Sequence, residues 1–223
     1  MPRKKVGVWE IMNVIDTINL SGVPLNIYEG PIAVSVSGGA DSALLLYHVM
    51  KHKKDCDITI ISISSQALDR ENSYAAKNIV EQCITLTRNF NVSHKISYFT
   101  WYEIEYNEYI NSKGGMIYTG ITQNPPKYVT DTFFQQVTQF DRDPEKTKET
   151  VYGNYYTPFY NIDKKKIAEM YKEDNLIETI FPLTRSCEYD PRNNFFYGVP
   201  NPKSGHCGVC WWCQERKWAF GKL

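Results

Sequence analysis

A short apolar strand that turns straight into an apolar helix is the feature that most restricts the fold of this chain. Residues 32–36 are mostly apolar and β-branched, which is typical of a buried parallel strand. Two adjacent glycines, Gly38 and Gly39, follow at once, and an apolar helical stretch occupies residues 43–50. We therefore predict a strand, a glycine turn and a helix over residues 32–50.

The same alternation of strand and helix continues along the chain. We predict strands at residues 58–63, 94–99 and 116–119 and helices at 75–84, 102–110 and 167–171. This alternation is typical of an α/β fold with a doubly wound, mostly parallel sheet and helices on both faces. In that architecture, ligands bind at the carboxyl ends of the strands. Residues 121–160 lack clear periodicity, so we expect a substrate-facing loop region with one helix near 131–140.

The N-terminal segment has apolar residues at helical spacing, which predicts a helix over residues 8–20 with one buried face. Glu10 and Asp16 interrupt its apolar stretch, which argues against an export signal. The sequence has no run of about 18 apolar residues that could span a membrane. We expect a cytoplasmic protein without membrane contact.

The turn over residues 37–42 has the chemistry of an anion site. Adjacent glycines let the backbone approach a phosphate, and the dipole of the following helix attracts its charge. The serine hydroxyls can donate to phosphate oxygens, and the aspartate suits a Mg²⁺ ion that bridges them. The alternative is a tight turn with a helix cap. The residues of this phosphate turn are Ser37, Gly38, Gly39, Ala40, Asp41 and Ser42.

A second polar loop leaves the predicted strand at 116–119 and belongs on the same rim. Gly120 would permit close approach of a ligand, and Thr122 and Asn124 offer hydrogen bonds to a nucleotide or substrate. A plain polar loop ending at two prolines is the alternative.

Four cysteines near the C-terminus have the spacing of a metal site. Cys187 is followed after nineteen residues by Cys207, Cys210 and Cys213, and four thiolates at such spacing can converge on a tetrahedral Zn²⁺ ion. An iron–sulfur cluster or unligated thiols are the alternatives. A closed set of four ligands leaves no open catalytic position, so we expect a structural role. His206 is a further candidate ligand but is favoured as a neighbour.

The overall charge is balanced, with 25 lysines and arginines against 25 aspartates and glutamates. Such a chain lacks the basic surface that nucleic-acid binding usually requires, so a small-molecule substrate fits better. The two remaining cysteines, Cys56 in a turn and Cys83 on an apolar helix face, are expected to be inert.

Three C-terminal segments carry a more specific pattern. They read Pro-Phe-Tyr-Asn-Ile-Asp-Lys-Lys-Lys-Ile at 158–167, Pro-Leu-Thr-Arg-Ser-Cys-Glu-Tyr-Asp at 182–190 and His-Cys-Gly-Val-Cys-Trp-Trp-Cys-Gln-Glu-Arg-Lys at 206–217. Together with the phosphate turn, they resemble the 7-cyano-7-deazaguanine synthases, the QueC/ExsB family of PP-loop ATP pyrophosphatases. The landmarks extend from residue 31 to residue 220.

The resemblance implies an activity and an organisation. The carboxylate of 7-carboxy-7-deazaguanine attacks the α-phosphate of ATP, ammonia displaces AMP, and a second adenylation converts the amide to the nitrile. Residues 31–182 would form the PP-loop ATP-binding domain and residues 183–223 a zinc-binding segment packed on it, after an N-terminal helical segment at 1–30. Members of the family often form homodimers.

Three residue roles come from the resemblance. Lys164 matches a lysine expected to contact phosphate, although a solvated lysine is the alternative. Arg185 is placed to meet the substrate carboxylate or, equally, to brace the zinc loop. Ser64 holds the strand-end position where the family reads the adenine.

The chain also departs from the family pattern. Ala43 replaces a threonine, Asn161 replaces an aspartate, and the Gly-Arg-Asn helix start is absent between residues 97 and 115. The loop between Cys187 and Cys207 is longer and rich in aromatic residues. A recess altered in this way is expected to accept an altered deazapurine or to stop at the amide, and such a compact, divergent form is what we expect of a virus-encoded copy.

Two other functions stay open at this point. A PP-loop tRNA thiolase or another amidating ligase would use the same turn, but sulfur transfer needs a reactive cysteine beside ATP. A zinc-stabilised nucleotide-binding module without turnover is the third candidate. No glutaminase segment is evident in the sequence, so free ammonia or a partner would supply nitrogen.

Overall fold

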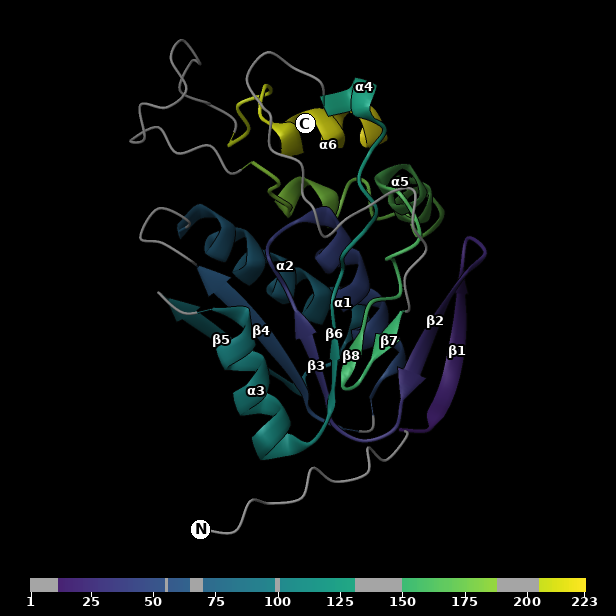
Figure 1. Ribbon diagram of the computed structural model, residues 1–223, viewed down its shortest axis with the longest axis vertical. Coiled ribbons are helices and arrows are strands. Elements are labelled where there is room, and N and C mark those ends of the chain that lie inside the picture. The colour runs from purple at the N-terminus through teal and green to yellow at the C-terminus, as the bar shows by residue number, and fades with distance from the viewer. Residues whose placement is uncertain (1–11, 55, 65–69, 99–100, 131–149, 188–204) are drawn as a thin grey trace.

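The computed structural model describes residues 12–54, 56–64, 70–98, 101–130, 150–187 and 205–223. In these residues the main sheet has the strand order β5-β4-β3-β6-β8-β7 (Figure 1). All neighbouring strands are parallel except β7 and β8. The predicted α/β class with a mostly parallel sheet is confirmed. The strands are β3 (Ile32–Ser35), β4 (Ile58–Ser64), β5 (Val92–Tyr98), β6 (Met116–Tyr118), β7 (Val151–Tyr152) and β8 (Tyr155–Tyr156).

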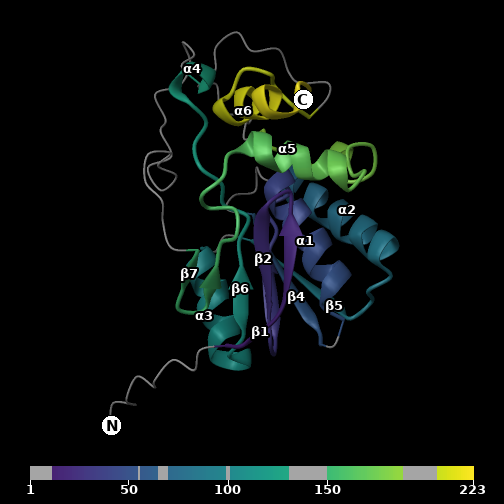
Figure 2. The ribbon, with the colours of Figure 1, turned by 90° about the vertical axis from the view of Figure 1, so that its right-hand side faces the viewer.

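Helices cover both faces of this sheet (Figure 2). The helices α1 (Ala40–His52) and α2 (Arg70–Thr87) lie on one face, and α3 (Tyr102–Lys113) lies on the other. Successive residues of a strand point to opposite faces, so Val34 joins the large core cluster and Ala33 joins the small one beneath α3. Burial on both sides explains why β3 is apolar almost throughout.

The N-terminal segment forms a β-hairpin. Strands β1 (Val14–Leu20) and β2 (Val23–Tyr28) pair antiparallel in a separate sheet of two strands. Ser21 and Gly22 join them with φ angles of 50° and 88°, as a type I′ turn requires. The predicted helix is therefore wrong over residues 14–20, and its first residues, 8–11, lie outside the described chain.

Two tyrosine hydroxyls attach this hairpin to the main sheet. Tyr118 on β6 accepts from the N–H of Tyr28 at 3.0 Å and donates to the carbonyl of Asn26 at 3.0 Å. The N–H of Asn26 donates to the hydroxyl of Tyr156 on β8 at 2.9 Å. Such partners lie far away in the chain, which is why periodicity near the N-terminus did not reveal the strand.

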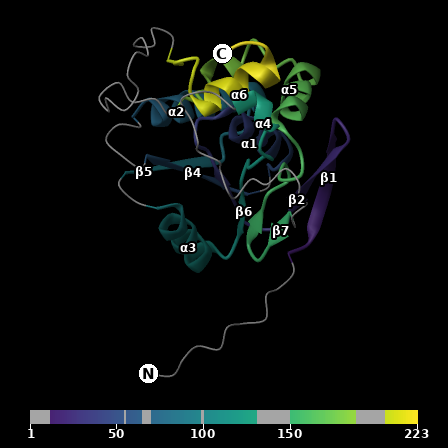
Figure 3. The same ribbon diagram turned by 45° about the horizontal axis from the view of Figure 1, so that its top comes forward.

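The C-terminal elements cover the carboxyl ends of the strands (Figures 1 and 3). Helix α6 packs against both α5 and α4. Asp163 caps α5, since its carboxylate accepts from the N–H groups of Lys165 at 2.9 Å and Lys166 at 3.1 Å. The predicted helix near 131–140 lies outside the described residues. These elements are α4 (Lys127–Thr130), α5 (Lys164–Glu173), the 3₁₀ helix η1 (Phe181–Leu183) and α6 (Trp211–Phe220).

Candidate functional site

The phosphate turn connects the carboxyl end of β3 to the first turn of α1. Gly38 has a φ of 90°, a left-handed conformation that favours glycine. Ser42 is buried, and its hydroxyl donates to the carbonyl of Gly39 at 3.1 Å and accepts from the N–H of Ser37 at 3.3 Å. The two serine hydroxyls are 3.3 Å apart. The turn is thus closed on itself by its own side chains.

The start of α1 has no side-chain cap. Its N-cap residue is Gly39, which has no side chain to accept from the first-turn N–H groups. On the core side, the buried Tyr171 of α5 donates its hydroxyl proton to the carbonyl of Ala40 at 2.8 Å. The helix start is therefore fixed from within, and its uncapped end has the polarity that attracts an anion.

Gly120 packs directly against this helix start. A Cβ atom at this position would lie 2.7 Å from the backbone nitrogen of Ser42 and 2.8 Å from its Cα atom. We predicted that glycine permits close approach of a ligand, but in the structure it is α1 itself that approaches. Thr122, predicted as a ligand contact, is 1% exposed. The loop is held by the N–H of Gln123, which donates to the carbonyl of Ile162 at 2.8 Å.

Beside the turn, a buried lysine lies between two carboxylates. Lys164 is the first residue of α5, and its Nζ atom is 3.1 Å from Oδ2 of Asp41 and 2.9 Å from Oε2 of Glu215. The side chains of Lys164 and Glu215 are 5% and 0% exposed. Burial removes the water that would weaken these attractions, so the group tightly links α1, α5 and α6.

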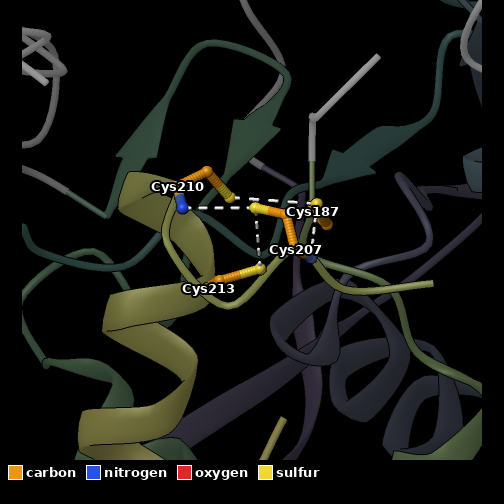
Figure 4. Close-up of side chains that lie close together, drawn as sticks. All are labelled: Cys187, Cys207, Cys210 and Cys213. Atoms are coloured by element: carbon orange, nitrogen blue, oxygen red, sulfur yellow. Dashed lines mark hydrogen bonds between the residues drawn. The ribbon is translucent and has the colours of Figure 1, made fainter. Parts of the chain in front are cut away.

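The four predicted metal ligands come together above the sheet (Figure 4). Their sulfur atoms all lie within 4.8 Å of one another. The Sγ atoms of Cys187 and Cys210 are 3.9 Å apart, and those of Cys207 and Cys213 are 4.0 Å apart. A tetrahedral ion with Zn–S bonds of about 2.3 Å needs sulfurs roughly 3.8 Å apart. The group therefore fits a single tetrahedral ion.

The four thiols are electrostatically linked to one another. Hydrogen bonds inside it, first those with Cys187, lower the pKa of Cys207 and raise the pKa of Cys210. The four thiols thus do not ionise together by themselves, whereas a bound cation would stabilise every thiolate. An iron–sulfur cluster places several iron atoms between its ligands and needs wider spacing than this group has. The geometry favours one ion.

His206 is a neighbour of the cluster. Its Nδ1 atom is 3.9 Å from Sγ of Cys213. Burial, followed by the charges of Arg216 and Arg185, lowers the pKa of His206 to about 4. The ring is therefore neutral at pH 7, and the four sulfurs complete a tetrahedral set without it.

Arg185 connects this cysteine segment, residues 183–223, to the phosphate turn. Its backbone N–H donates to the carbonyl of Gly38 at 2.8 Å. Its guanidinium donates to the carbonyl of Gly205, close to Cys207. The side chain therefore contacts the cysteine loop, and its predicted contact with a substrate carboxylate stays a prediction.

Arg216 fixes α6 over the rest of the molecule. The guanidinium donates to the hydroxyl of Thr184 at 2.7 Å and to the carbonyl of Phe181 at 3.1 Å. It also stacks 3.8 Å from the centre of the Phe181 ring. This buried anchor sets how α6 is rotated about its axis and hence which of its side chains reach Lys164.

A second polar chain supports the turn from the sheet. The hydroxyl of Ser62 donates to the carbonyl of Val36 at 2.7 Å and lies 2.9 Å from Nε2 of His94. Because its single proton goes to Val36, Ser62 accepts from His94, whose Nε2 therefore carries the hydrogen. Burial, with a smaller effect of Lys77, lowers the pKa of His94 to about 4.

The structure thus brings Asp41 and Lys164 together beside the turn. The side chain of Ser64 lies outside the described part, so its predicted adenine contact stays a prediction. Sequence reasoning missed Tyr171 and Glu215. Neither belongs to a spacing pattern of its own, since Tyr171 resembles any core aromatic residue and Glu215 resembles any helix carboxylate.

The sequence matches no family model and no curated protein. Among solved structures, the chain is similar to NMN synthetase from Francisella tularensis, with 16% sequence identity and a TM-score of 0.43 over 87% of this chain and 78% of that one. Within the described residues, none of the helices combines the length and apolar character needed to cross a membrane.

Proposed function

We propose that this chain is an ATP-dependent ligase of the PP-loop type that adenylates the carboxylate of a 7-deazapurine and passes it to ammonia. The observation that carries the proposal is the phosphate turn at the carboxyl end of β3, with Lys164 and Asp41 paired 3.1 Å apart beside it. Ligands of α/β folds bind at this edge of the sheet. The C-terminal motifs support a deazapurine acid as the substrate.

The turn would hold the β- and γ-phosphates of ATP. The uncapped N–H groups of α1 and the hydroxyl of Ser37 would be the donors, and the hydroxyl of Ser42 would exchange the carbonyl of Gly39 for a phosphate oxygen. Asp41 has the hard oxygen ligands that Mg²⁺ prefers, and the ion would neutralise charge on the departing pyrophosphate. Lys164 would supply a second positive charge at the same place.

The proposed chemistry is two successive substitutions. A carboxylate oxygen of the substrate attacks the α-phosphorus, the bond to the pyrophosphate oxygen breaks, and an acyl-adenylate forms. Ammonia then attacks the acyl carbon, AMP leaves with the oxygen that joined it to the acyl group, and the nitrogen loses a proton, which gives the amide. In a second cycle the amide oxygen attacks the α-phosphorus of another ATP and pyrophosphate leaves. The nitrogen then loses its two remaining protons as the carbon–oxygen bond breaks, so that the oxygen leaves in AMP and the nitrile remains. Adenylation is needed because a carboxylate by itself is a poor electrophile.

The cysteine cluster would hold structural zinc. Its four sulfurs form a closed set, so no ligand position remains for a substrate. Through Arg185 and Gly38 the zinc-bound segment would keep the phosphate turn in place. The guanidinium of Arg185 contacts Gly205, which supports this bracing role over contact with the substrate carboxylate.

The positions of the other cysteines do not favour a tRNA thiolase. Cys83 is buried, and burial raises the pKa of its thiol to about 12, so it is a poor nucleophile. Cys56 donates to the carbonyl of Gly30, and the two residues come just before β4 and β3 begin, at the opposite end of these strands from the turn. Neither thiol is placed to attack a group bound at the phosphate turn.

Pyrophosphate release tests the proposal. Zinc-loaded protein is incubated with MgATP, ammonium and 7-carboxy-7-deazaguanine, and product mass is read in parallel. We expect pyrophosphate, AMP and an amide or nitrile, all lost in Asp41→Ala. A matched control is Asp16→Ala, an exposed aspartate on β1. ATP binding without turnover would instead support a nucleotide-binding module, and incorporation of sulfur into tRNA would support the thiolase.

A further inference from the structure

The group formed by Asp41, Lys164 and Glu215 contains one more carboxylate than the proposed chemistry uses. Asp41 lies on α1 and would bind Mg²⁺, and Lys164 lies on α5 and would meet phosphate. Glu215 is fully buried on α6, 2.9 Å from the lysine ammonium. Burying a carboxylate costs free energy unless it is paired, and Glu215 has Lys164 as its ion-pair partner.

We propose that Glu215 is a positioning residue that holds Lys164 at the phosphate turn when ATP binds. During binding, Asp41 would give up its contact with the lysine ammonium and would instead contact the magnesium ion on the phosphate groups. This inference rests on the proposed function and deepens it. Without Glu215, the carboxylate of Asp41 would have to neutralise Lys164 and also bind Mg²⁺. With Glu215, the buried ammonium keeps a carboxylate partner throughout that exchange.

The location of Glu215 makes the lysine dependent on the cysteine segment. Glu215 lies two residues after Cys213 and directly before Arg216, whose guanidinium is anchored to Thr184 and Phe181. Both neighbours fix the rotation of α6, which packs against α5. The position of the Glu215 carboxylate, and hence of Lys164, is therefore set by how the cysteine segment folds, and the zinc proposed for its four cysteines would stabilise that fold.

A simpler role for Glu215 predicts the opposite result. If it were only a negative charge near an anion site, its neutralisation would strengthen the binding of ATP because repulsion would fall. If it positions Lys164, neutralisation leaves the lysine with Asp41, and MgATP must break that pair. Binding would then become weaker, and the gain in affinity that Mg²⁺ confers would shrink.

Calorimetric titration of the zinc-loaded protein with ATP, with and without Mg²⁺, separates these roles. We expect Glu215→Gln to weaken MgATP binding by about tenfold or more. The ratio of the affinity for ATP with Mg²⁺ to the affinity without Mg²⁺ should also fall. Glu215→Asp keeps the charge but shortens the side chain, so it should also weaken binding if position matters. Glu169→Gln, an exposed carboxylate on α5 paired with Lys166, is the matched control and should stay within about twofold.

The outcomes distinguish this inference from the proposed function. Zinc content and thermal unfolding are measured for each variant, and Glu215→Asp carries the test if Glu215→Gln does not fold. Equal or tighter MgATP binding by a folded variant, with normal wild-type turnover, overturns the role of Glu215 alone. Failure of the wild-type protein to bind ATP overturns both proposals.

Discussion

The backbone N–H of Arg185 donates to the carbonyl of Gly38 at 2.8 Å, which joins the cysteine segment to the phosphate turn. Gly38 has a left-handed conformation, and its carbonyl direction follows from that conformation. The contact therefore requires both the glycine and a folded cysteine segment. The folding of the segment that carries the four cysteines is thus coupled to the shape of the turn.

Loss of the metal should damage both stability and the turn. In Cys187→Ser we expect zinc content to fall and the free energy of unfolding to drop by about 3 kcal/mol, since one of the four proposed ligands, itself buried, is lost. Metal analysis and denaturant unfolding measure these effects. Cys56→Ser is the control because its Sγ atom lies outside the cluster and serine keeps a donor for Gly30. Equal zinc content in both variants would contradict the prediction.

Gly120→Ala should displace the start of α1. The added Cβ would meet the backbone of Ser42 at 2.7 Å, and backbone atoms cannot move aside cheaply. We expect a loss of about 2 kcal/mol in unfolding free energy. At Gly39 a Cβ would lie 3.4 Å from Oγ of Ser37, an ordinary contact, so Gly39→Ala is the stability control. Similar losses in the two variants would show that sterics at Gly120 are not the cause.

Arg216→Lys should loosen α6 although the charge is kept. One ammonium cannot reproduce the planar fork that bonds Thr184 and Phe181 and stacks on the ring. We expect about 2 kcal/mol of destabilisation in thermal or denaturant unfolding. Lys222→Arg, at an exposed pair with Glu178, should change stability little. If Arg216→Lys leaves the free energy of unfolding nearly unchanged, the forked guanidinium is not what anchors α6.

His94 should make stability depend on pH. Its pKa is lowered to about 4 in the folded protein by burial and then by Lys77, against 6.5 as its ordinary value. The unfolded chain binds the proton more readily, so this contribution is complete above pH 6.5 and is lost as the pH falls toward 4. Allowing for partial solvent screening, we expect about 2 kcal/mol across that window.

The His94→Gln variant isolates this effect. Glutamine retains an N–H donor for Ser62 but does not titrate, so the unfolding free energy should fall less steeply between pH 6.5 and 4 than in the wild-type protein. Chemical denaturation at several pH values provides both curves. Parallel curves would mean that other groups carry the pH dependence.

The local parts of the fold and site could be predicted from the sequence. The strand at 32–36, the glycine turn and the helix after it depend on neighbouring residues, and the structure places β3 and α1 there. The cysteine spacing likewise predicted a group that the structure brings within 4.8 Å. The N-terminal prediction was wrong because a short apolar stretch fits both the helical and the strand periodicity. Pairing with β2 decided that the segment forms a strand.

By itself, the sequence determined the alternation of strands and helices, the phosphate turn and the group of four cysteines, because these depend on residues close together in the chain. Only the tertiary structure decided that Glu215 faces Lys164, that Gly120 accommodates α1 and that Arg185 joins two segments. Such relationships arise when helices pack around a core. A single carboxylate or glycine carries no sign of the partner that packing will place beside it.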